Sequence, residues 1–115
     1  MIQVESLKKS GHFKTVLKEK KFHTDFFSIF AAKNFIKLKN KNVLSISFVM
    51  KKKIGSAVKR NRIKRKLKAI VVKLLKIKGA INYNYTYIVF GKTKAYNEKH
   101  DILLSEMAKT FKKIK

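Results

Sequence analysis

A dense run of cations between residues 59 and 68 is the part of this sequence best suited to chemistry, and that chemistry is phosphate binding. Seven Lys or Arg residues fall within these ten positions, and three more lysines precede them. Arg presents a planar fork of N–H donors that matches phosphate oxygens, and Lys adds compact point charges. The candidate phosphate-binding residues are Lys51, Lys52, Lys53, Lys59, Arg60, Asn61, Arg62, Lys64, Arg65 and Lys68.

This run lies in the N-terminal half of an expected helix, where positive charge is least favourable. Ser56 is suited to cap a helix that extends to about Ile77, with Gly79 just beyond its end. Cations near the positive N-terminal end cost about 0.3–1 kcal/mol each, and like charges four positions apart add repulsion. A solvated helix face is the simpler explanation, but no acid lies nearby to compensate. The free N–H groups of the first turn would add to a phosphate site.

The overall charge also indicates a polyanionic partner. The chain of 115 residues has a net charge of +24, with six acids that all lie near its two ends. Between Phe26 and Asn97 there are 19 basic residues and no acid. Nucleic acid is the usual partner of such a domain. We expect no membrane partner and a cytoplasmic location, because no apolar stretch is long enough to span a bilayer and no secretory signal is visible.

Neither a catalytic residue nor a protein metal site is predicted. The acids form no cluster of the kind that holds metal ions in protein nucleases, and Cys is absent. His12, His23 and His100 lack metal-ligand spacing, although the first two could still meet in space. Gly55 stands alone rather than in a glycine-rich phosphate loop.

The pattern of apolar and polar residues predicts the helices and strands that must position these cations, and together they indicate one α+β domain over residues 1–115. The order is helix, strands, helix, strand, helix, which gives a small mixed sheet of about four strands with three helices. We expect helices at Ser10–Glu19, Ser56–Ile77 and from an Asn97 cap onwards; strands at Phe26–Ala32, Val43–Met50 and Tyr85–Phe90, with a further short one at Lys21–His23; and a hairpin loop at Lys37–Asn42.

Several aromatic residues have two competing interpretations. Aromatic rings close to lysines can stack unpaired bases, but they can equally be core residues. Strand alternation places Phe26 and Phe30 on one face and Phe27 and Ile29 on the other, so at least one of these pairs should be buried. Phe13 is open to both interpretations.

The segment from Lys52 to Arg65, KKIGSAVKRNRIKR, resembles the signature of the bacterial ribonuclease P protein family. In that family a Lys-Lys-aliphatic-Gly segment leads into Arg-Asn-Arg-Ile-Lys-Arg. Chain length, charge and element order are similar too, from about Leu7 to Ile114. The first helix carries the family's Phe-x-x-Val pattern at Phe13 and Val16.

The resemblance implies a fold, partners and roles. The fold would contain a left-handed βαβ crossover through the basic helix, which would dock on a catalytic RNA. A cleft formed by Phe13, Leu17 and Phe30 would hold the single-stranded 5′ leader of precursor tRNA. One protein would assist one RNA in endonucleolytic leader removal, with Mg²⁺ held mainly by the RNA.

Some residues depart from the family pattern. Leu17 replaces a Phe, Phe30 replaces a Tyr, Glu19 and Lys20 fill a turn that usually carries Gly, and Ser47 and Lys51 stand where the family usually has Gly and Ser. These changes concern the leader contacts more than the basic helix. The alternative function is that of a structural ribosomal or ribosome-assembly protein, which only the signature argues against. A DNA-binding architectural protein is less favoured, because the cations are too dense for base readout.

Overall fold

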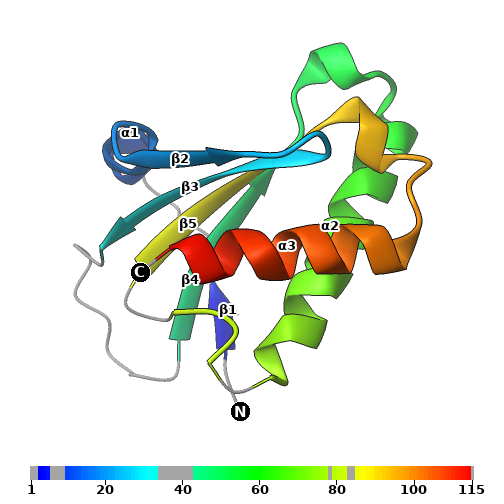
Figure 1. Ribbon diagram of the computed structural model, residues 1–115. Coiled ribbons are helices and arrows are strands. Elements are labelled where there is room, and N and C mark those ends of the chain that lie inside the picture. Colours follow the sequence, from blue (N-terminus) through cyan, green and yellow to red (C-terminus); the bar gives the residue numbers. More distant parts are fainter. Residues whose placement is uncertain (1–2, 6–9, 34–42, 78, 83–84, 115) are drawn as a thin grey trace.

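The computed structural model describes residues 3–5, 10–33, 43–77, 79–82 and 85–114, which form an α+β fold with three α-helices and one mixed sheet (Figure 1). This confirms the fold class expected from the sequence. In chain order the elements are β1 (Gln3–Glu5), α1 (Ser10–Leu17), β2 (Lys20–His23), β3 (Phe27–Lys33), β4 (Val43–Val49), the 3₁₀ turn η1 (Lys52–Ile54), α2 (Ala57–Leu75), β5 (Tyr85–Gly91), the 3₁₀ turn η2 (Thr93–Ala95) and α3 (His100–Lys113).

The sheet has the strand order β1-β4-β5-β3-β2, with β5 in the middle. β5 pairs with β4 in parallel and with β3 antiparallel, and β2 and β1 add the two edges. The expected hairpin between β3 and β4 is therefore wrong, since β5 lies between them. The expected loop at 37–42 lies outside the described residues. β5 is buried over most of its length, so the centre of the sheet, paired on both sides, is its favourable place.

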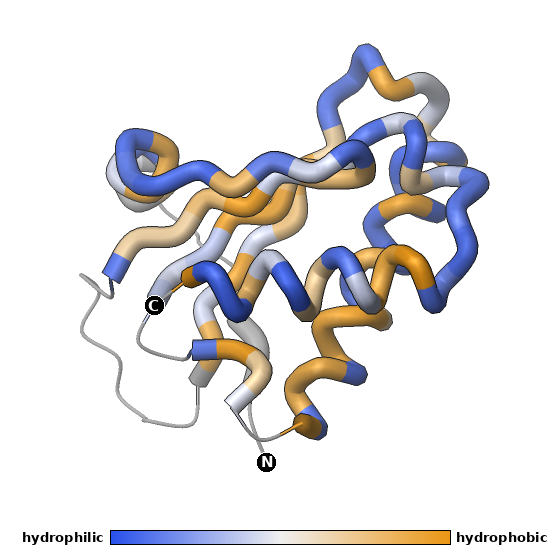
Figure 2. Tube along the Cα trace, viewed as in Figure 1, coloured by the Kyte–Doolittle hydropathy of each residue, from blue (hydrophilic) through white to orange (hydrophobic). Residues whose placement is uncertain are grey.

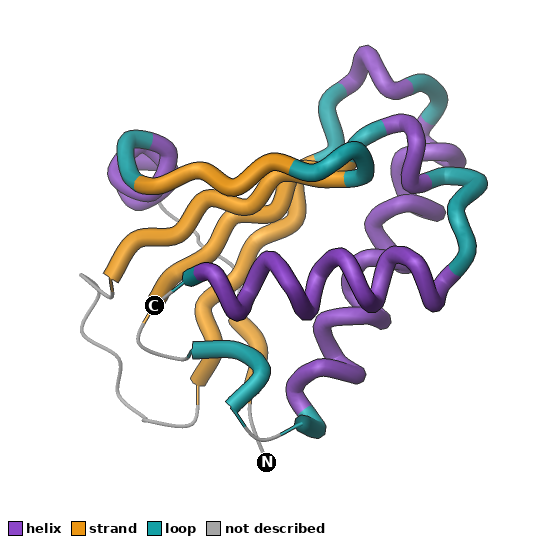
Figure 3. Tube along the Cα trace, viewed as in Figure 1, coloured by secondary structure: helices purple, strands orange, loops and turns teal. Residues whose placement is uncertain are grey.

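Strand alternation divides the fold into layers (Figure 3). On one face, Phe27 and Ile29 are fully buried in the main core with residues of α2 and α3. On the other face, Ala32 and Ile88 pack with Val16 of α1 in a smaller cluster. α1 therefore covers part of the face opposite to α2 and α3.

α2 packs close to the sheet at the end of β5, and glycine makes this approach possible. A Cβ at Gly91 would lie 2.8 Å from Ile63 Cγ2 and would also meet the sulfur of Met50. Ile63 is fully buried on the apolar stripe of α2, so it has little room to move. Gly91 thus fixes how closely the basic helix lies against the strand that leads into the loop at residue 92.

Three local expectations differ from the structure. β1 is an edge strand that the sequence did not indicate, and α1 ends at Leu17 rather than Glu19. Asn97 does not cap α3: the N-cap is Lys99, without a side-chain hydrogen bond, and the helix begins at His100. The preceding residues instead form η2 and a turn whose carbonyl groups are held by a lysine of α2. Among the described residues, no helix is long and apolar enough to cross a membrane.

Candidate nucleic-acid interface

The first half of α2 forms a cationic surface that faces away from the sheet. Ser56 caps the helix as expected, since its hydroxyl accepts a hydrogen bond of 3.3 Å from the Lys59 N–H. Figure 2 shows that this half of α2 is mostly hydrophilic, whereas its second half is mostly hydrophobic. Buried residues from Ile63 to Leu74 hold the opposite side of the helix against the core. The exposed side chains on the outer surface are Asn61, Arg62, Lys64, Arg65 and Lys68, and Lys59 and Arg60 are half-buried.

Arg60 and Asn61 lie beside Phe48 of β4 and the adjacent Met50, where Arg60 is half-buried and Asn61 is exposed. Together with Lys64 they line a small depression of about 200 Å³ against Phe48 and Met50. The Arg60 Nε atom is buried there, and the described residues offer it no hydrogen-bond partner.

The three lysines before α2 separate into two groups. All three are exposed: Lys52 and Lys53 lie on η1, and Lys51 directly precedes it. Gly55 then turns the chain into the helix with a φ of 144°, which favours glycine. Lys51 and Lys53 line a groove on the α1 side of the sheet, whereas Lys52 is not among its lining residues. The lysine triplet therefore links the basic helix to the groove.

That groove has a volume of about 930 Å³ and combines an aromatic floor with positive charge. Phe30 and Phe90 meet edge to face, with ring centroids 5.4 Å apart. The Lys21 ammonium lies 5.1 Å from the Phe30 centroid and that of Lys51 lies 5.5 Å from the Phe90 centroid. The lining residues are Leu17, Lys21, His23, Ser28, Phe30, Lys51, Lys53, Ile54, Phe90, Gly91, Lys92 and Thr93.

Two of the three residues predicted for a leader cleft line this groove. Leu17 is 39% exposed at the end of α1, and Phe30 lies on the floor. Phe13 does not line it: the ring is half-buried and packs on the cluster of Val16, Ala32 and Ile88. This supports the core interpretation that the sequence left open, and a leader contact by Phe13 stays a prediction.

Sequence reasoning did not assign the other eight lining residues to a site, and the charged, aromatic or titratable ones among them are Lys21, His23, Phe90 and Lys92. Alternation in β5 places Phe90 on the same face as Ile88, but the sequence does not show which face is left open. Lys92 is held in place by a hydrogen bond from its Nζ to the Thr24 carbonyl oxygen, at 2.6 Å. This contact joins segments 68 residues apart, so no local pattern could have indicated it.

His23 lies in the groove, and its surroundings favour the uncharged form of the ring. Its Nδ1 lies 2.7 Å from the Ser28 hydroxyl oxygen across the β2–β3 pair. Desolvation, followed by the positive charges of Lys21 and Lys92, lowers the pKa of His23 below its usual value. A phosphate beside these cations would favour the protonated ring instead. The side chain of His12 lies outside the described residues, so a pairing of the two histidines stays a hypothesis.

The donor set of this interface does not fit a metal ion held by protein. Mg²⁺ prefers carboxylate and other oxygen ligands, whereas Lys, Arg and Phe predominate here. Within the described residues no group of three His, Cys, Asp or Glu side chains is arranged to hold a metal. We therefore assign no catalytic step to a metal bound by these residues.

A family model described as Ribonuclease P matches residues 1–115. The RNase P protein of Thermotoga maritima superposes with a TM-score of 0.75 at 22% identity, over 96% of this chain and 98% of the other. The RNase P protein of Staphylococcus aureus gives 0.73 at 22% identity, over 96% and 94%. A search of curated proteins gives no match. At this identity the structural likeness concerns the fold.

Proposed function

The chain belongs to the ribonuclease P protein family, and from that membership we propose that it is the protein subunit of a ribonuclease P in which an RNA subunit performs catalysis. The protein would bind this RNA and the 5′ leader of precursor tRNA, and so assist removal of the leader. We expect one protein to act with one RNA in the cytoplasm. Mg²⁺ would be held mainly by the RNA.

The observation that supports RNA docking most directly is the outer surface of α2. Arg62, Lys64 and Arg65 are exposed beside one another, and no acidic residue occurs in the first turn. Their mutual repulsion has no structural benefit within the protein, but it would be relieved by phosphates. RNA phosphates would also release condensed counterions on binding, which favours association at low salt.

The groove supports a second, separate contact with a single strand. A strand of unpaired nucleotides needs surfaces that stack bases and cations that follow its phosphates. Phe30 and Phe90 supply the former, and the lysines around them supply the latter. The groove adjoins α2 through η1, so one RNA could be docked on the helix while the leader of another occupies the groove.

The experiment that tests this proposal is leader removal from a labelled precursor tRNA at low Mg²⁺, by a bacterial ribonuclease P RNA with and without this protein. Restored cleavage at the mature 5′ end would support the subunit function. Tight RNA binding without any stimulation, in a reaction with the cognate RNA, would favour the alternative of a structural ribosomal or ribosome-assembly protein.

A further inference from the structure

The loop that connects η2 to α3 is attached to the basic helix by one lysine. The Lys66 Nζ atom donates hydrogen bonds to the carbonyl oxygens of Ala95 at 2.9 Å, Tyr96 at 2.9 Å and Glu98 at 2.8 Å. An ammonium group has three donors, so these contacts use all of them. Lys66 is half-buried, unlike the exposed Lys64 two positions earlier. Its charge therefore holds the loop and is not free for a phosphate.

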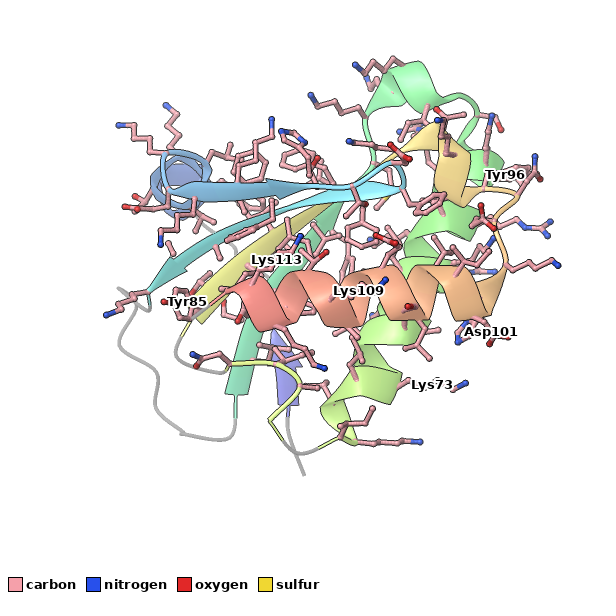
Figure 4. All side chains as sticks on the ribbon, viewed as in Figure 1. Lys73, Tyr85, Tyr96, Asp101, Lys109 and Lys113 are labelled. Atoms are coloured by element: carbon pink, nitrogen blue, oxygen red, sulfur yellow. The ribbon has the colours of Figure 1, made fainter. Side chains whose placement is uncertain are left out.

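The same loop places an aromatic ring under two of the cations on α2. The Lys59 Nζ lies 5.1 Å from the centroid of Tyr96, and the Arg62 Cζ lies 5.2 Å from it. Figure 4 labels Tyr96 on this loop beside α2. The ring is half-buried and packs against the main core, which restricts its movement. Both distances are within the range of a cation–π attraction.

Lys59 and Arg62 are three positions apart, so they are neighbours on one face of the helix. Two like charges in this arrangement repel each other and would tend to spread into many rotamers. The electron-rich ring attracts both groups and restricts them to one region. A surface whose long side chains are ordered before binding loses less entropy when a partner docks.

We propose that Tyr96 is a positioning residue for RNA docking, in which its ring, fixed by the hydrogen bonds of Lys66 to the loop, orients Lys59 and Arg62 towards the RNA. This inference rests on the proposed function of α2 as the docking surface. It extends that surface to residues 92–99, which are far from α2 in the sequence. Tyr96 itself need not contact the RNA.

The test measures the affinity of the full-length protein for a bacterial ribonuclease P RNA at fixed salt. Tyr96→Leu should weaken binding by roughly threefold to tenfold, because two cation–π contacts are lost. Tyr96→Phe retains the ring and should stay within about twofold of the parent protein. In a Lys59→Ala, Arg62→Ala background, Tyr96→Leu should have little further effect, because the groups it orients are absent.

Two controls separate positioning from general stability. Phe26→Leu shortens another half-buried aromatic residue that packs on the same core, and the described part of the structure places no cation over its ring. It should lower the melting temperature without a matching loss of RNA affinity. In NMR spectra of the free protein, Tyr96→Leu should remove the ring-current shift of the Arg62 side-chain N–H, whereas Tyr96→Phe should retain it. Should Tyr96→Leu fail to fold, Tyr96→Met must give the same pattern.

The possible results distinguish this inference from the proposed function. If Lys59→Ala, Arg62→Ala binds the RNA as well as the parent protein does, α2 is not the docking surface and the proposed function loses its main support. If that variant binds weakly but Tyr96→Leu binds normally, only the positioning role is overturned. An equal loss from Tyr96→Leu in both backgrounds would also overturn it.

Discussion

Replacing Arg60, Arg62, Lys64 and Arg65 by Ala should make the dependence of RNA affinity on salt concentration less steep, lowering the slope of the double-logarithmic plot by about 3. Each phosphate contact contributes a slope of roughly 0.7–0.9 when the logarithm of the association constant is plotted against that of the salt concentration. Four lost contacts therefore remove about 3 units, which corresponds to roughly a thousandfold loss of affinity at 0.1 M salt.

The same substitution should have little effect on folding. Ala has the highest helix propensity, and the variant is relieved of repulsion near the positive end of the α2 dipole. Arg60 and Arg62 lose packing against the depression at Met50 and the ring of Tyr96. Because these effects oppose each other, the free energy of unfolding should change by no more than about 1 kcal/mol. A large drop in RNA affinity with an almost unchanged free energy of unfolding would indicate that these side chains serve binding rather than stability.

The assay is filter binding or fluorescence anisotropy with a bacterial ribonuclease P RNA between about 50 and 400 mM salt. A control variant that loses the same number of charges replaces Lys76, Lys109, Lys112 and Lys113 by Ala. All four are exposed, and none is among the residues that line the groove or the depressions beside α2. Figure 4 labels Lys109 and Lys113 on α3. Its slope should change by less than about one unit. An unchanged slope in the arginine-rich variant, or an equal change in the control, would refute the assignment of α2 as the docking surface.

Three further outcomes are expected. Gly91→Ala should lower the free energy of unfolding by about 1–3 kcal/mol in thermal or denaturant melts, because the added Cβ has no room. Gly11→Ala is the control, since a Cβ there meets open space and should not destabilise the protein. A comparable loss of stability at Gly11 would contradict the packing argument. His23 should titrate below its usual pKa of 6.5 in NMR spectra of the free protein. Since the folded-state pKa of His23 is lowered, its titration favours unfolding as the pH falls below 6.5. Binding of a leader oligonucleotide should raise this pKa. A pKa at or above 6.5 in the free protein would be inconsistent with the desolvation of the ring and the charges of Lys21 and Lys92. Phe90→Ala should weaken binding of a single-stranded leader by about 1–3 kcal/mol and Phe13→Ala by clearly less, whereas the reverse order would place the leader over α1.

The sequence by itself indicated the three helices, the three longer strands and the family. The apolar stripe of α2, the Ser56 cap and the strands at 27–33, 43–49 and 85–91 depend on local periodicity and capping, which are visible in the residues themselves. The signature from Lys52 to Arg65 indicated the family that the match over residues 1–115 then confirmed. Periodicity also showed that Phe27 and Ile29 or their neighbours must be buried, without showing which.

Only the tertiary structure decided which cations are available and where the groove lies. Lys64 and Lys66 are two positions apart in one run of basic residues. Lys64 is exposed, whereas Lys66 donates hydrogen bonds to three carbonyl oxygens about 30 positions away. Phe90 meets Phe30 because β5 pairs with β3 rather than leaving β3 next to β4. These contacts depend on strand order and helix placement. Many long-range interactions determine that arrangement together, and no single segment of the chain encodes it.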